Sequence, residues 1–150
     1  MAIFLSADQR ALLDVVLDRL IPPSGTMPGA GQVGTADYLD TVAGESPRLA
    51  RLFAAGLRSI ETAAVRRDSS FVQMSGDQQD DVLRHVESSK SAFFEMLLLH
   101  TYNGYYSNPE IVEALGLEPR PPQPRGHEVE FGDFTALEAV TSRGQAYREA

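Results

Sequence analysis

The sequence contains no cysteine among its 150 residues. Disulfide bonds, zinc sites built on thiolates, covalent haem attachment through C-x-x-C-H and cysteine nucleophiles are therefore excluded. The sequence also lacks an apolar run of the roughly 18 residues that a membrane-spanning helix needs. We therefore expect no direct membrane insertion.

Positive charge is scarce. The chain carries 13 lysines and arginines against 21 acidic residues, for a net charge of −8. Binding to phosphates needs a basic face, so we expect no nucleic-acid partner. The first ten residues, MAIFLSADQR, have no basic n-region, no apolar h-region and no twin-arginine pair. They predict a cytoplasmic protein, with a periplasmic location as the alternative if the chain is a trimmed mature form.

Motifs that carry chemistry are missing as well. There is no G-x-S-x-G, and the glycine-rich run at 29–34 has neither a preceding strand nor G-x-G-x-x-G spacing, which favours a mobile connector. Asp81 and His85, four residues apart, would form only one edge of a metal site, so an exposed helical ion pair is favoured. We predict no catalytic residue, no cofactor bound by this chain and no metal site.

Helical periodicity, in contrast, is clear along most of the chain. Capping boxes at Ser6 with Gln9 and at Ser75 with Gln78 open two helices, Thr35 is a candidate cap, and Ser46-Pro47 is a further start signal. No convincing pair of strands occurs. We predict an all-α fold, a compact bundle of about six helices near residues 7–20, 35–42, 47–66, 76–86, 91–104 and 109–115.

The segment at 91–104 is apolar on almost every side, which predicts a central helix buried on all sides and ended by Gly104. His100 shares a face with Phe93 and Leu97, so a buried, hydrogen-bonded core histidine is favoured. The alternative is a stand-alone ligand-binding protein or enzyme with a pocket near His100.

From residue 118 the sequence changes character, with four prolines in the seventeen residues EPRPPQPRGHEVEFGDF. We divide the chain into a helical domain at 1–117 and an extended, proline-rich C-terminal arm at 118–150. The arm either binds a partner or packs on its own domain. Self-association through its aromatic residues is a third possibility.

Aromatic residues cluster where the central helix ends, and amphipathic side chains of this kind are common in interfaces. Asn108 could equally be a helix cap, and at least one tyrosine should belong to the core. The predicted partner interface joins this cluster to the arm: Tyr102, Tyr105, Tyr106, Asn108, Arg120, Pro121, Pro122, Arg125, Phe131 and Phe134.

A row of arginines follows the outer face of the third predicted helix. The favoured interpretation is the solvated face of an amphipathic helix, and a docking surface for an acidic partner is the alternative. The row consists of Arg48, Arg51, Arg58 and Arg66.

Several of these landmarks occur in the same order in a known family. The string GYYSNP at 104–109 resembles the G-Y-Y-S-x-P signature of the gluconate 2-dehydrogenase subunit 3 family. The resemblance spans about residues 5–116 and includes the helix end at Ile21-Pro22, Phe71, the start at Ser75–Gln79, and Phe93-Phe94.

This resemblance implies a small, non-catalytic subunit that binds and stabilises a larger FAD-dependent dehydrogenase of the glucose–methanol–choline (GMC) type. FAD would be held by that partner, which oxidises a sugar or alcohol, and a cytochrome c often accepts the electrons. The chain departs from longer members: it has no twin-arginine signal, and EIVEALGLEPRPPQPRG replaces a segment that contains tryptophan. We therefore expect a cytoplasmic complex or a shorter branch with another substrate.

Overall fold

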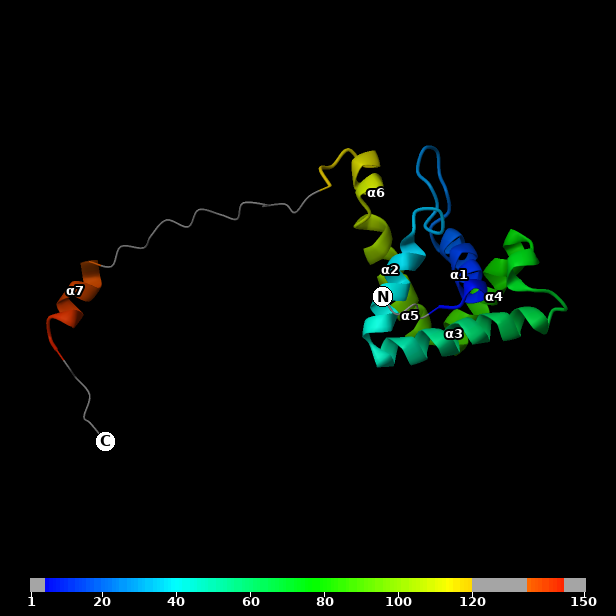
Figure 1. Ribbon diagram of the computed structural model, residues 1–150, viewed down its shortest axis with the longest axis horizontal. Helices are drawn as coiled ribbons and strands as arrows, with labels where there is room; N and C mark the ends of the chain where they lie inside the picture. The colour runs from blue at the N-terminus through cyan, green and yellow to red at the C-terminus, as the bar shows by residue number, and fades with distance from the viewer. Residues whose placement is uncertain (1–4, 120–134, 145–150) are drawn as a thin grey trace, which may run out of the picture. The chain divides into compact units, whose positions relative to one another are not determined.

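The structure is a computed structural model that describes residues 5–119 and 135–144 (Figure 1). The chain divides into two compact units, Met1–Pro119 and Arg120–Ala150, each of which is considered by itself. In the second unit, one helix, α7 (Thr135–Thr141), is described. The arm positions predicted to contact a partner lie outside the described residues: Arg120, Pro121, Pro122, Arg125, Phe131 and Phe134.

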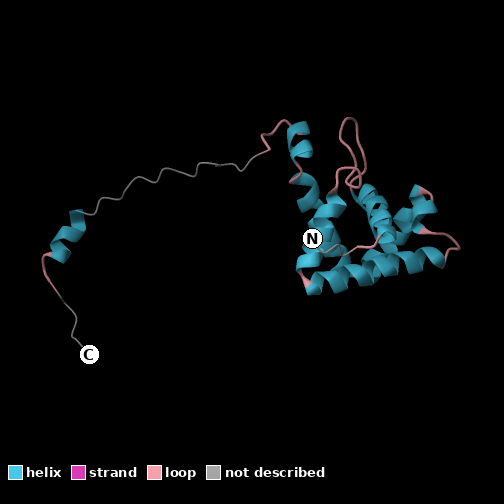
Figure 2. Cartoon of the chain, viewed as in Figure 1, coloured by secondary structure: helices cyan, strands magenta, loops and turns pink. Residues whose placement is uncertain are grey.

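The described residues of the first unit, 5–119, form six α-helices and one short 3-10 helix. They are α1 (Ala7–Leu20), α2 (Thr35–Glu45), α3 (Pro47–Val65), η1 (Phe71–Gln73), α4 (Gly76–Ser89), α5 (Ser91–Tyr106) and α6 (Pro109–Ala114). The described residues contain no strand, as Figure 2 shows, so the predicted all-α class is confirmed. None of the helices in the described ranges combines the length and hydropathy that a bilayer crossing needs.

The helices begin where local capping chemistry predicts. The Ser6 hydroxyl accepts a hydrogen bond from the Gln9 N–H at 3.2 Å, and the Gln9 side chain accepts one from the Ser6 N–H at 3.0 Å. Ser75 and Gln78 repeat this box at α4. The prediction for α2 is wrong by one residue: Gly34, in the left-handed region at φ 73°, is the cap, and Thr35 is buried in the first turn.

Helix α5 is the centre of the domain, because it contacts α1, α2, α3, α4 and α6. Its inward face carries buried side chains, including Phe93, Phe94 and Leu97. The predicted stop at Gly104 is wrong: the helix continues to Tyr106, and Gly104 lies against the Tyr38 ring of α2. A glycine at this point lets two helices approach closely instead of ending one.

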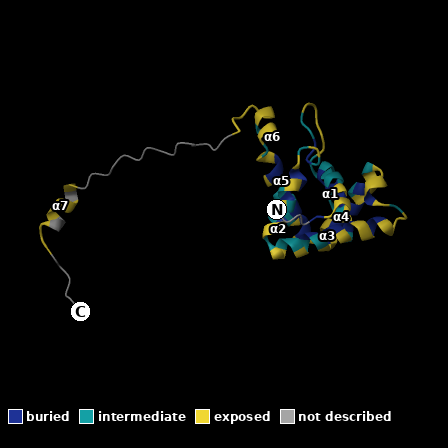
Figure 3. Cartoon of the chain, viewed as in Figure 1, coloured by how far each residue is buried: buried dark blue, intermediate teal, exposed yellow. Residues whose placement is uncertain are grey.

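Every helix of this unit contributes to the core, and the buried positions lie where the helices face one another (Figure 3). The Phe53 and Phe93 rings meet edge to face with centroids 5.8 Å apart. Gly56 of α3 lies directly against the Phe93 ring, where a β-carbon would collide with it. This contact sets how closely α3 and α5 can pack.

The loop at 22–34 is tied to the helices, in contrast to the predicted mobile connector. The Asp18 carboxylate of α1 accepts a hydrogen bond from the Gly31 N–H at 2.8 Å, and Ala30 is fully buried. A β-carbon at Gly29 or Gly31 would collide with α1. Gly29 and Gly31 therefore serve close packing against α1.

Candidate partner interface

Helix α5 is not buried on all sides, which corrects the prediction from its composition. Leu99, Tyr102 and Tyr106 are 47%, 48% and 52% exposed. Their spacing of three and four residues places them in one line along the helix. The rings of Tyr102 and Tyr106 stack with centroids 6.2 Å apart and planes 30° apart. We call Leu99, Tyr102 and Tyr106 the tyrosine face.

Tyr105 lies about a quarter turn around the helix from this face and is only 2% exposed. Its hydroxyl donates a hydrogen bond to the Pro28 carbonyl oxygen at 2.8 Å. Burial, followed by the neighbouring Tyr106, raises the pKa of the Tyr105 hydroxyl. The interpretation of at least one tyrosine as a core residue therefore applies to Tyr105.

Asn108 is occupied twice within the domain. Its side-chain oxygen accepts a hydrogen bond from the Glu110 N–H at 2.9 Å, which confirms the prediction that Asn108 is a helix cap, here of α6. Its side-chain N–H donates to the Val33 carbonyl oxygen at 2.7 Å. Of the four predicted interface residues that the structure describes, Tyr102 and Tyr106 are exposed, whereas Tyr105 and Asn108 hold the loop at 22–34.

Helix α6 adds apolar surface that the sequence reasoning missed. Ile111 is fully buried and anchors the helix, whereas Leu115 and Leu117 just beyond it are largely exposed. The sequence contained a signal for this surface, because Ile111, Leu115 and Leu117 follow one another within seven residues. A helix this short cannot turn all three side chains toward the domain. Exposed apolar side chains that gather near one another mark interaction surfaces more often than single ones do.

His100 is half-buried between aromatic rings, with Tyr38 and Phe53 at centroid distances of 6.2 and 6.3 Å. Its buried Nδ1 has no hydrogen-bond partner in the described structure, so the predicted hydrogen-bonded histidine is wrong in that respect. Burial lowers the pKa of His100. An imidazole in this setting favours its neutral form.

His85 is exposed on α4. Asp81 forms an ion pair with Arg84 at 3.0 Å instead of with His85. Within residues 5–119 and 135–144, no cluster of three or more side chains is arranged to hold a metal ion. The predicted row of arginines is exposed to solvent along α3 and its C-terminal cap: Arg48, Arg51, Arg58 and Arg66.

The comparisons with known proteins give a single result. Neither the search of curated proteins nor the search of solved structures finds a match. A family model described as gluconate 2-dehydrogenase subunit 3 matches residues 7–119, which is more than half of the chain. The match covers all six α-helices of the first unit. The chain belongs to the gluconate 2-dehydrogenase subunit 3 family.

Proposed function

We propose that this protein is a non-catalytic accessory subunit that binds and stabilises a larger FAD-dependent dehydrogenase of the GMC type. In this proposal the larger subunit holds the FAD and oxidises a sugar or alcohol. The small chain contributes binding surface only. Membership in a family of dehydrogenase subunits supports a role within such a complex.

The observation that carries the proposal is the tyrosine face. A central helix normally buries its large apolar side chains, yet Leu99, Tyr102 and Tyr106 of α5 are about half exposed. Tyrosines lose little conformational entropy on binding and are enriched where interfaces concentrate their binding energy. A partner that covers this face would remove the exposed apolar area from water.

The surroundings make this face a rigid one. Tyr105, between the two exposed tyrosines, is fixed by its hydrogen bond to Pro28, and its ring meets that of Tyr106 edge to face at 5.0 Å. A preorganised surface loses less entropy on association than a flexible one. The buried tyrosine therefore supports the exposed pair.

The test is to purify the tagged, full-length chain from its native cells and record the visible spectrum of the eluate. We expect a larger protein and flavin absorption with the unmodified chain. We expect both to be lost with a Tyr102→Ser/Tyr106→Ser double variant. A cytochrome c subunit, if present in the complex, would add a haem spectrum.

A matched control is available on another part of the same domain. Val65 and Val72 are also exposed apolar residues. A Val65→Ser/Val72→Ser variant should retain the flavoprotein. A colourless eluate that contains only the unmodified chain would contradict the proposal, as would equal retention by the tyrosine and valine variants.

A further inference from the structure

A shallow groove runs along α3, where three hollows adjoin. Their volumes are about 660, 290 and 370 Å³, in order from the start of the helix toward its end. Ala55 lines all three, Leu52 and Ala92 line the first and second, and Ser89 and Lys90 line the second and third. Because neighbouring hollows share walls, they form one groove between α3 and the segment where α4 gives way to α5.

This groove is basic in an acidic protein. Five of the chain's 13 lysines and arginines line it, and Glu95 is the one acidic residue among the described lining residues. The five are Arg48, Arg51, Arg58, Arg66 and Lys90. A net charge of −8 over the whole chain thus conceals a concentrated positive surface.

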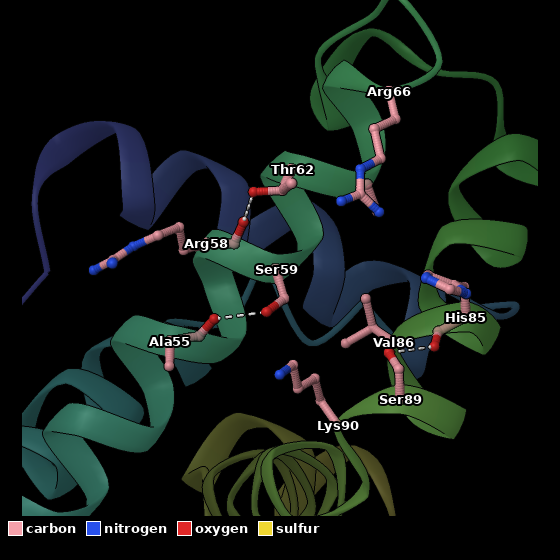
Figure 4. Close-up of a pocket in the computed structure, with 10 residues that line it drawn as sticks. Ala55, Arg58, Ser59, Thr62, Arg66, His85, Val86, Ser89 and Lys90 are labelled. Carbon is pink, nitrogen blue, oxygen red and sulfur yellow. Dashed lines mark hydrogen bonds between the residues drawn. The ribbon is translucent and has the colours of Figure 1, made fainter.

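These charges are not used within the domain. In the described part of the chain, ion pairs are formed by Arg10, Arg19 and Arg84 with aspartates, and by none of the five basic residues of the groove. Figure 4 shows Arg66 and Lys90 extending into the hollow between α3 and α4, with His85 on its far wall, while Arg58 extends away from it. Arg66 and Lys90 are therefore available to an incoming group at this end of the groove.

Between the charged residues, the groove is lined by apolar side chains, some of them small. Leu49 and Leu52 of α3 face Ala92 and Met96 of α5 across the largest hollow. Ala55 and Gly56 continue this lining in the next one. The groove can therefore accept apolar side chains between its charged walls, as grooves that bind peptide segments do.

We propose that this groove binds an acidic segment of the partner protein, with carboxylates spaced along an apolar stretch. The inference rests on the proposed function for the existence of that partner. Charge complementarity carries the choice of occupant. Arg48 at the start of α3 and Arg66 at its C-terminal cap are 18 residues apart, or about 27 Å along the helix axis, which suits successive carboxylates and not a single anion.

Nucleic acid fits this groove less well. Proteins that bind single strands combine cations with exposed aromatic platforms for the bases. Among the described lining residues, Phe93 is the one phenylalanine, tyrosine or tryptophan, and it is only 2% exposed. The net charge of −8 over the whole chain would also repel phosphates.

Lys90 provides a sharp test, because it is the only lysine in the sequence. A carbodiimide joins an amine to a carboxylate that it contacts directly, forming an amide without a spacer. Treating the purified complex of the full-length chain with this reagent should link Lys90 to an aspartate or glutamate of the larger subunit, and peptide mass spectrometry would identify it. Lys90→Arg retains the charge without the amine and should abolish this link while the complex still forms.

Two neighbouring arginines give a matched pair of charge reversals. Arg66 lines the groove and Arg67 does not, although both are exposed residues just beyond α3. Arg66→Glu should weaken the complex about fivefold at low salt, whereas Arg67→Glu should leave the affinity within about twofold. Raising the salt concentration should reduce the difference between the two variants.

The outcomes separate this inference from the proposed function. If the complex forms, Lys90 gives no link to it and Arg66→Glu binds like Arg67→Glu, the groove proposal is overturned while the accessory role stands. If the chain purifies alone, both fail together. If nuclease-sensitive nucleic acid copurifies and is lost in Arg66→Glu, the acidic segment is replaced by nucleic acid as the occupant.

Discussion

The Tyr105 hydroxyl donates a hydrogen bond to the Pro28 carbonyl oxygen at 2.8 Å, across 77 positions of sequence. It joins the central helix to the long loop at 22–34, and Asn108 makes a second connection to the same loop at Val33. The exposed tyrosine face therefore lies beside residues that hold the domain together. Two neighbouring tyrosines have opposite roles because the helix turns one toward the loop and the other toward solvent.

Tyr105→Phe should lower the free energy of unfolding by about 1 kcal/mol. The change removes one hydrogen bond and leaves the Pro28 carbonyl oxygen without its donor, while the ring still fills its site. Urea denaturation of the purified chain would measure the loss. Tyr106→Phe is the control, because Tyr106 is 52% exposed and should change stability by less than about 0.5 kcal/mol.

Variants of Asn108 should separate its two hydrogen bonds. Asn108→Ala removes both the cap of α6 and the link to Val33, and we expect a loss of about 2 kcal/mol. Asn108→Asp keeps an oxygen that accepts from the Glu110 N–H but has no donor for Val33, so it should lose about half as much. Equal stability of the two variants in urea would show that the cap contributes nothing, whereas an Asn108→Asp variant as stable as the unmodified chain would show that the loop contact contributes nothing.

Local capping chemistry made much of the fold predictable from the sequence. The boxes at Ser6 and Ser75 each close within three residues, so no knowledge of distant parts of the chain was needed. The apolar positions of α3 were equally clear, because a helix with one apolar stripe has one way to face a core.

The candidate site was harder to predict because it depends on how helices meet. Helix α5 is apolar on nearly every side, and its composition alone cannot show which side remains uncovered. Gly104 illustrates the same limit: it was expected to end a helix, but it packs against Tyr38 inside one. The groove combines α3 with Lys90, which the linear row of arginines did not include.

Gly56→Ala should destabilise the protein by about 1 to 2 kcal/mol. In a helix interior this change normally stabilises by about 0.5 to 1 kcal/mol. Here the new β-carbon would overlap the Phe93 ring, which is buried and held edge to face by Phe53. Overpacking of this kind typically costs about 1 to 3 kcal/mol.

Gly104→Ala is the matched comparison for Gly56→Ala. Its β-carbon would lie 2.8 Å from a carbon of the Tyr38 ring, a closer approach than packing allows but a milder one. Tyr38 is only half-buried and can shift. In thermal unfolding, Gly56→Ala should therefore have a lower melting temperature than Gly104→Ala. The reverse order would contradict the close packing of α3 on α5.

The stability of the domain should fall between pH 7.5 and pH 5.5 in a way that depends on His100. Burial lowers the pKa of His100 below its ordinary value of 6.5, so the unfolded chain takes up this proton at a higher pH than the folded one. The unfolded state then binds more protons as the pH drops below 6.5, and the free energy of unfolding decreases until the pH is below the folded pKa. The window ends at pH 5.5 because the pKa of Asp14, raised by burial from 3.8, would add a change of opposite sign at lower pH.

Melting temperatures at pH 7.5 and pH 5.5 would measure the effect of His100. The melting temperature of His100→Gln should fall less between these pH values than that of the unmodified chain. The exposed His85→Gln is the control, and its melting temperature should fall as much as that of the unmodified chain. An equal loss in His100→Gln would show that the imidazole of His100 is no less solvated in the folded protein than in the unfolded chain.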